Sequence, residues 1–150
     1  MRNKKIFWFT GQPGSGKTVL ALLLKKHLEE KYNDFVFHID GDELRTLFNN
    51  MKYDKDGRET NITRAQDVAK FVHNNGFDVI VSMVSPFKEI REQFKEDMGM
   101  DILEIYVHTS NERGREHFHT EYEEPTHNFF NLDTTDILPK DSLTQLLDLI

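Results

Sequence analysis

The hydrophobic residues of the chain form short continuous runs, separated by segments in which they recur every three to four positions. The short runs are rich in aromatic and β-branched residues, which is typical of buried strands. They comprise residues 4–10, 35–39, 77–84 and 102–107, with a weaker fifth run at 129–132. Because strands alternate with helices, the pattern predicts a mainly parallel sheet with helices on both faces.

The segments between these runs have helical periodicity and predict helices. They cover residues 19–31, 44–50, 63–73, 86–97 and 142–150. Thr63 and Gln66 resemble a capping box at the start of the third helix, and Gly76 suits the left-handed position after its end. Ser85 followed by Pro86 is the pattern of a cap for the fourth helix. We expect a loop at 51–58 and a polar, mobile flap at 110–126.

Length, charge and cysteine content narrow the class of protein further. A chain of 150 residues suits one domain, residues 1–150. The formal net charge of -7 and the pI near 5.5 argue against a nucleic-acid binder. The absence of cysteine excludes disulfides and thiol catalysis, and no apolar run reaches the roughly 18 residues of a membrane span. The N-terminus predicts a first strand and not a signal peptide, so we expect a cytoplasmic protein.

The segment with the clearest chemistry is GQPGSGKT, residues 11–18, between a predicted strand and a predicted helix. In this setting a G-x-x-x-x-G-K-[ST] motif binds nucleotide phosphates, because backbone N–H groups converge on an anion at a helix N-terminus. Lys17 would reach the β- and γ-phosphates, and the Thr18 hydroxyl would hold Mg²⁺. The nucleotide-binding residues expected from this motif are Gly11, Pro13, Gly14, Ser15, Gly16, Lys17 and Thr18.

Two carboxylates follow the second predicted strand, in the run Asp40-Gly41-Asp42. Ligands of parallel sheets bind beyond the carboxyl ends of the strands, so the P-loop, this pair and Ser85 are expected at one edge. A carboxylate there can hold a metal or accept the proton of an acceptor hydroxyl, and Asp42 also suits a helix N-cap. Asp78 begins its strand, so we expect it at the opposite edge, as a surface or capping residue.

Several motifs in this order resemble the adenylyl-sulfate kinase family. The matching segments are the P-loop, Asp-Gly-Asp-Glu-Leu-Arg at 40–45, Gly-Arg-Glu-Thr-Asn-Ile-Thr-Arg at 57–64, Ser-Pro-Phe at 85–87 and Tyr-Glu-Glu-Pro at 122–125. The P-loop alone is shared by many kinases, whereas the ordered set is far more specific. It covers the first two-thirds of the chain well.

The resemblance implies a P-loop kinase fold with a five-stranded sheet, and ATP- and Mg²⁺-dependent transfer of a phosphoryl group to the 3′-hydroxyl of adenylyl sulfate. It also implies small nucleotide substrates and a homodimer. Asp42 would be the catalytic base or a Mg²⁺ ligand with Asp40 in support, beside Lys17 and Thr18. The substrate-binding residues that it implies are Arg45, Tyr53, Arg58, Asn61, Arg64, Ser85 and Phe118.

The flap departs from the family pattern, because residues 111–117 are shorter than the family's lid run and lack its lysines. Arg113 is either a lid cation over the nucleotide or a solvated charge. Two other functions therefore stay open: a kinase for another small alcohol, such as a nucleoside or a sugar, and a silent nucleotide-binding module. The histidines of this region, which we expect to be exposed and not to bind metal, are His108, His117, His119 and His127.

Overall fold

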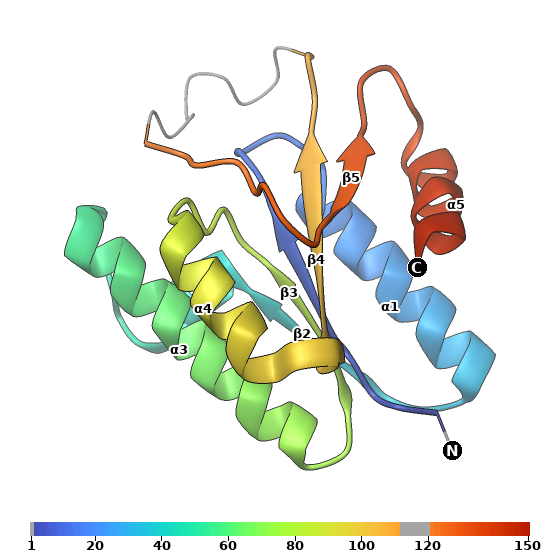
Figure 1. Cartoon of the computed structure of the whole chain (residues 1–150), viewed down its shortest axis with the longest axis horizontal. Coiled ribbons are helices and arrows are strands. Elements are labelled where there is room, and N and C mark those ends of the chain that lie inside the picture. Colours follow the sequence, from blue (N-terminus) through green and yellow to red (C-terminus); the bar gives the residue numbers. More distant parts are fainter. Residues whose placement is uncertain (1, 112–120) are drawn as a thin grey trace.

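The computed structural model describes residues 2–111 and 121–150, which form a central sheet between two layers of helices (Figure 1). The sheet has five strands in the order β2-β3-β1-β4-β5, and all neighbouring strands are parallel. The strands are β1 (Ile6–Thr10), β2 (Val36–Asp40), β3 (Asp78–Ser82), β4 (Ile102–His108) and β5 (Phe130–Asp133). The helices are α1 (Lys17–Tyr32), α2 (Gly41–Leu47), α3 (Lys55–Asn74), α4 (Lys88–Met98), the short η1 (Gly99–Asp101) and α5 (Pro139–Leu149). The α/β class expected from the sequence is confirmed.

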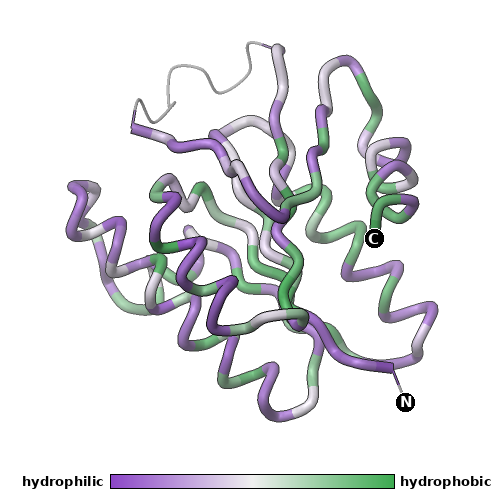
Figure 2. Tube along the Cα trace, in the orientation of Figure 1, coloured by the Kyte–Doolittle hydropathy of each residue, from purple (hydrophilic) through white to green (hydrophobic). Residues whose placement is uncertain are grey.

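Alternate residues of β1 supply the two halves of the hydrophobic core. Ile6 and Trp8 belong to the half that includes residues of α3 and α4, whereas Phe7 and Phe9 belong to the half that includes residues of α1 and α5. All four are almost fully buried, because helices cover both faces of a parallel sheet. Figure 2 shows the hydrophobic positions concentrated along the strands, whereas much of α3 and α4 is hydrophilic.

Helix α3 begins earlier than the sequence predicts. Asp54 caps it, since its carboxylate accepts a hydrogen bond from the Gly57 amide at 2.8 Å. The loop expected at 51–58 is therefore wrong in its second half, and so is the capping box at Thr63. The Thr63 hydroxyl lies inside the helix and donates to the carbonyl of Glu59. The end was predicted correctly, because Gly76 has a left-handed backbone (φ 95°) directly after the C-cap.

The cap expected at Ser85 is also wrong. Helix α4 begins at Lys88, and Ser85 instead takes a left-handed conformation (φ 48°) in the loop after β3. Its hydroxyl accepts a 3.0 Å hydrogen bond from the indole N–H of Trp8, so the side chain points into the protein. Ser85 is buried in consequence, and two residues separate it from the start of α4.

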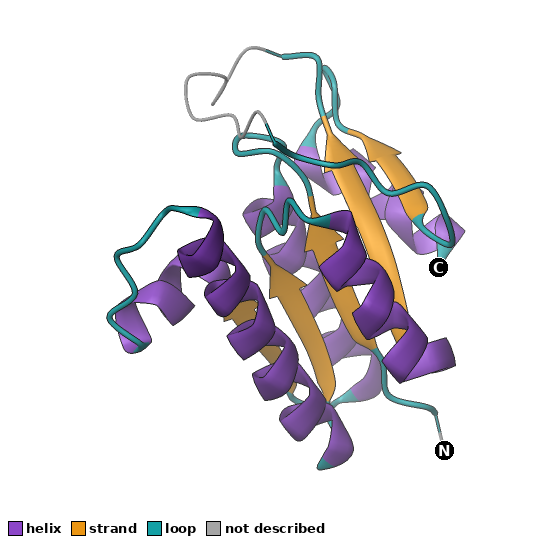
Figure 3. Ribbon diagram, turned by 60° about the vertical axis from the view of Figure 1, so that its left-hand side comes forward, coloured by secondary structure: helices purple, strands orange, loops and turns teal. Residues whose placement is uncertain are grey.

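All strands of the sheet run in the same direction, so it has one amino edge and one carboxyl edge (Figure 3). Different polar residues lie at the two edges. Asp78 lies at the amino edge, opposite the P-loop, as its place in the strand predicts. It is not a surface residue, however, because it is 1% exposed. Its carboxylate accepts the backbone N–H of Lys5 at 2.7 Å and pairs with Arg2 at 2.5 Å. The carboxyl edge carries the P-loop after β1 and Asp40 at the end of β2.

The C-terminal elements lie close to those expected. Strand β5 matches the run at 129–132, and α5 begins at Pro139, before the expected residue 142, with the proline at a first helical position. Within residues 2–111 and 121–150, no helix has both the length and the apolar character needed to pass through a bilayer.

Candidate active site

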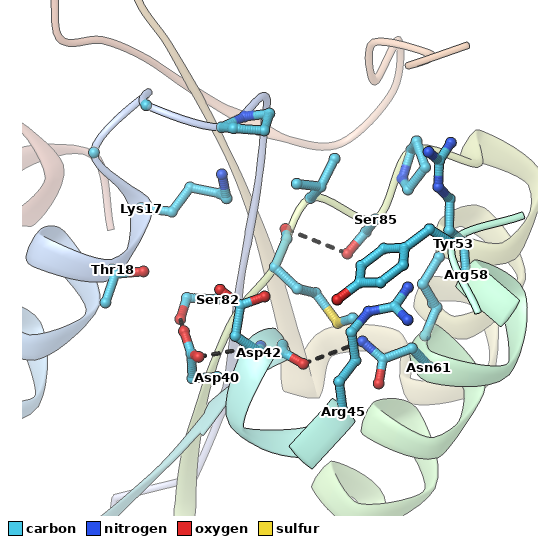
Figure 4. A pocket seen from close by; sticks show the side chains of 18 of the residues that line it. Lys17, Thr18, Asp40, Asp42, Arg45, Tyr53, Arg58, Asn61, Ser82 and Ser85 are labelled. Carbon is cyan, nitrogen blue, oxygen red and sulfur yellow. Dashed lines mark hydrogen bonds between the residues drawn. The ribbon is translucent and has the colours of Figure 1, made fainter. Parts of the chain in front are cut away.

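A cavity of about 420 Å³ opens at the carboxyl edge of the sheet (Figure 4). Residues of the P-loop and the start of α1 line one side, and the start of α2 and residues 82–86 line the middle. Tyr53, Arg58 and Asn61 line the side opposite Lys17. The structure thus brings the expected phosphate-binding loop and the expected acceptor-binding residues to one cavity.

The P-loop owes its shape to glycines in conformations that other residues avoid. Gly11 (φ 153°) passes so close to β4 that an added Cβ would lie 2.1 Å from the carbonyl oxygen of Val107. Gly14 and Gly16 also have positive φ, of 80° and 103°. Ser15 is buried, and its carbonyl accepts a 2.8 Å hydrogen bond from the Thr134 hydroxyl after β5. Gly11 and Ser15 therefore shape the loop from behind, while Pro13, Gly14 and Gly16 line the cavity.

Lys17 lies folded into this loop. Its ammonium donates to the carbonyl of Gln12 at 2.8 Å, and the side chain is 8% exposed. Burial lowers the pKa of Lys17 to about 8, although the carboxylates of Asp42 and Asp40 raise it in part. A phosphate in the loop would offer this ammonium a charged partner in place of a carbonyl.

The two carboxylates after β2 have different surroundings. Asp40 is the N-cap of α2, since its Oδ2 accepts from the amides of Asp42 (3.1 Å) and Glu43 (3.2 Å). The cap expected at Asp42 therefore belongs to Asp40, and α2 begins at Gly41, before the expected residue 44. Asp42 sits in the first turn of α2 and lines the cavity, on the same side as Thr18.

The residues present fit a magnesium ion. The Thr18 hydroxyl and the carboxylates of Asp40 and Asp42 all line the cavity and are hard oxygen donors, which Mg²⁺ prefers. Residues 2–111 and 121–150 contain no group of three or more His, Asp or Glu that could hold a metal by itself.

Ser82 and His38 stand behind Asp40 and were missed by the sequence analysis. The Ser82 hydroxyl lies 3.5 Å from Asp40 Oδ1 and 2.7 Å from His38 Nε2. Ser82 lines the cavity, and burial lowers the pKa of the His38 imidazole. Strand register could have identified Ser82 from the sequence, because Asp40 and Ser82 are paired at the ends of neighbouring parallel strands.

Arg45 and Tyr53 form one unit in the cavity wall. Arg45 Nη1 donates to the carbonyls of Asn50 (3.1 Å) and Lys52 (2.8 Å), which fixes the connection between α2 and α3. The guanidinium carbon lies 4.2 Å from the centre of the Tyr53 ring, which is half exposed. Arg45 therefore supports the ring of Tyr53, one of the residues that the resemblance assigns to substrate binding.

Arg58 and Asn61 reach the cavity from the first turns of α3. The Asn61 amide donates to the carbonyl of Gly41 at 3.2 Å, and its Oδ1 is buried without a hydrogen-bond partner among the described residues. Arg58 forms an ion pair with Glu121, and its Nε is likewise buried and unpaired within the described part of the chain. Unsatisfied polar atoms beside a cavity favour a bound ligand, because such atoms are costly to bury alone.

Not every expected residue reaches the cavity. Arg64 is one turn beyond Asn61, and its guanidinium lies over the ring of Phe48, 4.5 Å from the ring centre. It is absent from the described cavity lining, whereas buried Ser85 is part of it. The expectations for Arg113 and Phe118 lie outside the described residues.

Two of the four histidines that the sequence analysis singles out, His108 and His127, are described by the structure, and both have protein partners. His108 Nε2 lies 3.0 Å from the side-chain oxygen of Asn131, and His108 is only half exposed because it stacks on Tyr106. His127 is exposed, as expected, and its Nδ1 lies 2.8 Å from the Thr126 hydroxyl. His117 and His119 lie outside the described residues.

Comparison with known proteins bears on the same residues. A family model described as adenylylsulphate kinase matches residues 3–126. A cytidine diphosphoramidate kinase from Campylobacter jejuni is 36% identical over 70% of the chain, and a probable adenylyl-sulfate kinase from Pyrococcus abyssi is 40% identical over 67%. The chain spans 61% and 58% of the lengths of these two relatives.

A solved structure agrees over almost the whole chain. An APS kinase from Mycobacterium tuberculosis, in complex with AMPPNP and APS, is 25% identical and superposes with a TM-score of 0.85. The match covers 99% of this chain and 98% of that one. The likeness in fold therefore includes the C-terminal residues beyond the family match.

Proposed function

We propose, from the premise that the chain belongs to the adenylylsulphate kinase family, that it transfers the γ-phosphoryl group of ATP to the 3′-hydroxyl of adenylyl sulfate. The observation that carries this proposal is the single cavity shared by Lys17, Asp42 and the Tyr53–Arg58–Asn61 wall. Its two sides suit the phosphates of one nucleotide and the base and anionic groups of another.

Each residue has a definite task in this reaction. The P-loop amides and Lys17 bind the ATP phosphates and stabilise charge as the phosphoryl group moves. The acceptor oxygen attacks the γ-phosphorus while the bond to the β–γ bridging oxygen breaks and ADP leaves. Asp42 accepts the proton of the acceptor hydroxyl. Mg²⁺ would be held by Thr18, Asp40 and Asp42, and would neutralise phosphate charge when bound.

The acceptor is recognised by the wall opposite the P-loop. Tyr53 stacks on the adenine and is supported from below by Arg45. Arg58 binds the phosphosulfate, since a planar guanidinium matches an oxyanion, and the unpaired Oδ1 of Asn61 accepts a hydrogen bond from a ribose hydroxyl. Arg64 is left out of this set, because its guanidinium is engaged with Phe48.

A direct assay tests the proposal. Purified protein is incubated with ATP, Mg²⁺ and adenylyl sulfate, and the 3′-phosphorylated product is measured by chromatography. Lys17→Ala serves as the inactive control, and EDTA should stop the reaction if Mg²⁺ is required. Product no more abundant than in the Lys17→Ala control would refute the substrate assignment.

A second acceptor is favoured by one specific comparison. The Campylobacter jejuni relative is named as a cytidine diphosphoramidate kinase and matches the chain as well as the adenylyl-sulfate kinases do. A panel of nucleoside, sugar and cytidine diphosphoramidate acceptors separates the two functions, because a changed acceptor still consumes ATP productively. Tight ATP binding without transfer to any acceptor would favour a silent nucleotide-binding module.

Two further expectations stay proposals. A homodimer, implied by the resemblance, is tested by light scattering during size-exclusion chromatography. A cytoplasmic location is tested by fractionating cells that contain the protein.

A further inference from the structure

We propose that Arg91 is a positioning residue for phosphoryl transfer: it clamps the loop that carries Ser85 to the segment that begins at residue 121. Arg91 belongs to α4 and lies behind the cavity, outside the described lining residues. The inference rests on the proposed function, because a positioning role requires chemistry beside Ser85. It is carried by one buried guanidinium that joins three separate parts of the fold.

The Arg91 guanidinium makes a hydrogen bond with each of its three nitrogens. Nε donates to Oε2 of Glu104 on β4 at 3.0 Å. Nη1 donates to the carbonyl of Ser85 at 2.5 Å, and Nη2 donates to the carbonyl of Glu123 at 2.5 Å. The planar fork of arginine fixes the directions of such divergent bonds, whereas the compact ammonium of lysine does not. Strand β4 thereby becomes the rigid support for two irregular segments.

Burial of the Arg91–Glu104 ion pair costs free energy, so the pair calls for a function beyond stability. Arg91 is 3% exposed and Glu104 is 2% exposed, so both charges have left water. A buried ion pair often stabilises a fold no better than apolar residues of similar size. The pair is compensated by Lys95, whose ammonium donates to Glu104 Oε1 at 2.8 Å. What apolar residues could not supply is the pair of donors for the Ser85 and Glu123 carbonyls.

The carbonyls of Ser85 and Glu123 lie where two segments of the chain, residues 85–86 and 121–123, pass each other beside the cavity. The Glu123 amide donates to the carbonyl of Pro86 at 2.9 Å, so the two segments are bonded to each other as well as to Arg91. The neighbouring Tyr122 hydroxyl lies 2.9 Å from that of Thr10, at the end of β1. Ser85 and Pro86 line the middle of the cavity, and Glu121 pairs with Arg58 in the wall opposite Lys17. A shift where the two segments cross would therefore move both of these parts of the cavity lining.

The nucleotide side is held by other contacts. The P-loop is shaped by its glycines and held by Thr134, and it meets the loop that carries Ser85 where the Gly11 amide donates to the Val84 carbonyl at 3.4 Å. Loss of the Arg91 contacts should consequently lower the rate of transfer or weaken acceptor binding, and leave binding of ADP intact. Small displacements of reacting groups are costly to rate, by up to about 100-fold for an ångström.

Trp8 offers a direct readout of this loop. It is the single tryptophan of the chain, and its indole N–H donates to the Ser85 hydroxyl. Trp8 also lines a small cavity with Arg91 and Glu104, so a change in its emission reports a change in the contacts between Arg91 and the Ser85 loop, whether or not the protein has been given the right acceptor. This separates failure of the positioning role from failure of the proposed function.

The test compares Arg91→Lys with wild type. We expect unchanged affinity for ADP by calorimetry, an altered Trp8 emission spectrum and a kcat/KM for the acceptor lower by about 10-fold or more. Arg91→Met combined with Glu104→Gln removes both buried charges, so it should be more stable than Arg91→Met alone without restoring the spectrum or the rate. Wild-type emission and wild-type kcat and KM in Arg91→Lys would overturn the proposal.

A matched control is available at the other end of the sheet. Arg2 also donates to a buried carboxylate, that of Asp78, but at the amino edge. Arg2→Lys should leave both Trp8 emission and kcat unchanged. If it changes them as much as Arg91→Lys does, the effect is general loosening of the fold and the positioning role is refuted. If wild type transfers to no acceptor, the proposed function has failed, and Trp8 emission still shows whether Arg91 holds the Ser85 loop in place.

Discussion

At the scale of a single residue, Lys17 combines a charge with burial, and this gives nucleotide binding a characteristic pH dependence. With a pKa of about 8, its ammonium is charged in the free protein below that pH and loses its proton above it. A bound phosphate favours the charged form, so above pH 8 binding must take up a proton. We predict that affinity for ADP without Mg²⁺ falls above pH 8, by at most about tenfold per pH unit. Calorimetry between pH 7 and 9.5 measures it.

The matched variant is Lys17→Arg, which keeps its charge across this range. Its affinity for ADP should be lower than that of wild type and independent of pH above 8. The unusual pKa belongs to the folded protein, because it results from burial in the loop. A wild-type affinity that stays constant from pH 7 to 9.5 would show that Lys17 remains charged there.

Asp42 carries the prediction that concerns the chemical step. In Asp42→Asn the side chain keeps its size but can no longer accept a proton, so transfer should slow by about 100-fold or more. ADP affinity measured without Mg²⁺ should change little, because the P-loop is untouched. The cap of α2 is provided by Asp40, so the fold should also be preserved. Rapid-quench measurement of product checks the rate, and near-normal turnover would exclude Asp42 as the base.

At the scale of the element, α3 depends on a glycine in its first turn. Gly57 faces the preceding connection so closely that an added Cβ would lie 2.1 Å from the carbonyl oxygen of Lys52. Alanine normally favours a helix over glycine by about 1 kcal/mol, but this overlap opposes it. We predict that Gly57→Ala lowers the free energy of unfolding by about 1–3 kcal/mol. Urea denaturation measures it.

The control for this prediction is Thr60→Ala, at an exposed position in the same helix. It should change stability by no more than about 0.5 kcal/mol. Because Lys52 adjoins Tyr53, Gly57→Ala should also weaken acceptor binding, which Thr60→Ala should not do. Stabilisation by Gly57→Ala would mean that the connection can move aside freely.

The elements also show what the sequence can and cannot predict. The strands and the P-loop were predicted well, because continuous apolar runs and a strand–glycine loop–helix context depend on local sequence. The start of α3 was missed, since its first turn is polar and contains Gly57, which resembles a loop. Ser85 was misassigned as a cap because the partner that draws it inward, Trp8, is distant in sequence.

The site also divides into features that local sequence determines and features that depend on tertiary packing. Strand order brought Lys17, Asp40, Asp42 and Ser85 to one edge as predicted, because the rule for parallel sheets needs only the strand ends. The stacking of Arg64 on Phe48 could not be predicted from spacing, since it depends on how α2 packs against α3.

At the scale of the whole molecule, the two edges of the sheet have separate tasks. The carboxyl edge collects the cavity residues, among them Arg58 and Asn61, each with a buried polar atom that has no partner among the described residues. The amino edge contains a buried carboxylate, Asp78, that is fully engaged with Arg2 and the Lys5 amide. Stability at one edge and chemistry at the other should therefore respond to different substitutions.

Asp78→Asn tests this division. The substitution leaves Arg2 without its charged partner and removes a charge that the backbone of Lys5 binds, so it should cost about 3 kcal/mol of stability. The midpoint of thermal unfolding should then fall by roughly 6–12 °C. Below that midpoint, ADP affinity and kcat should match wild type, because Asp78 lies at the edge opposite the cavity. A variant that folds but loses nucleotide binding would place Asp78 among the functional residues and would contradict the separation of the two edges.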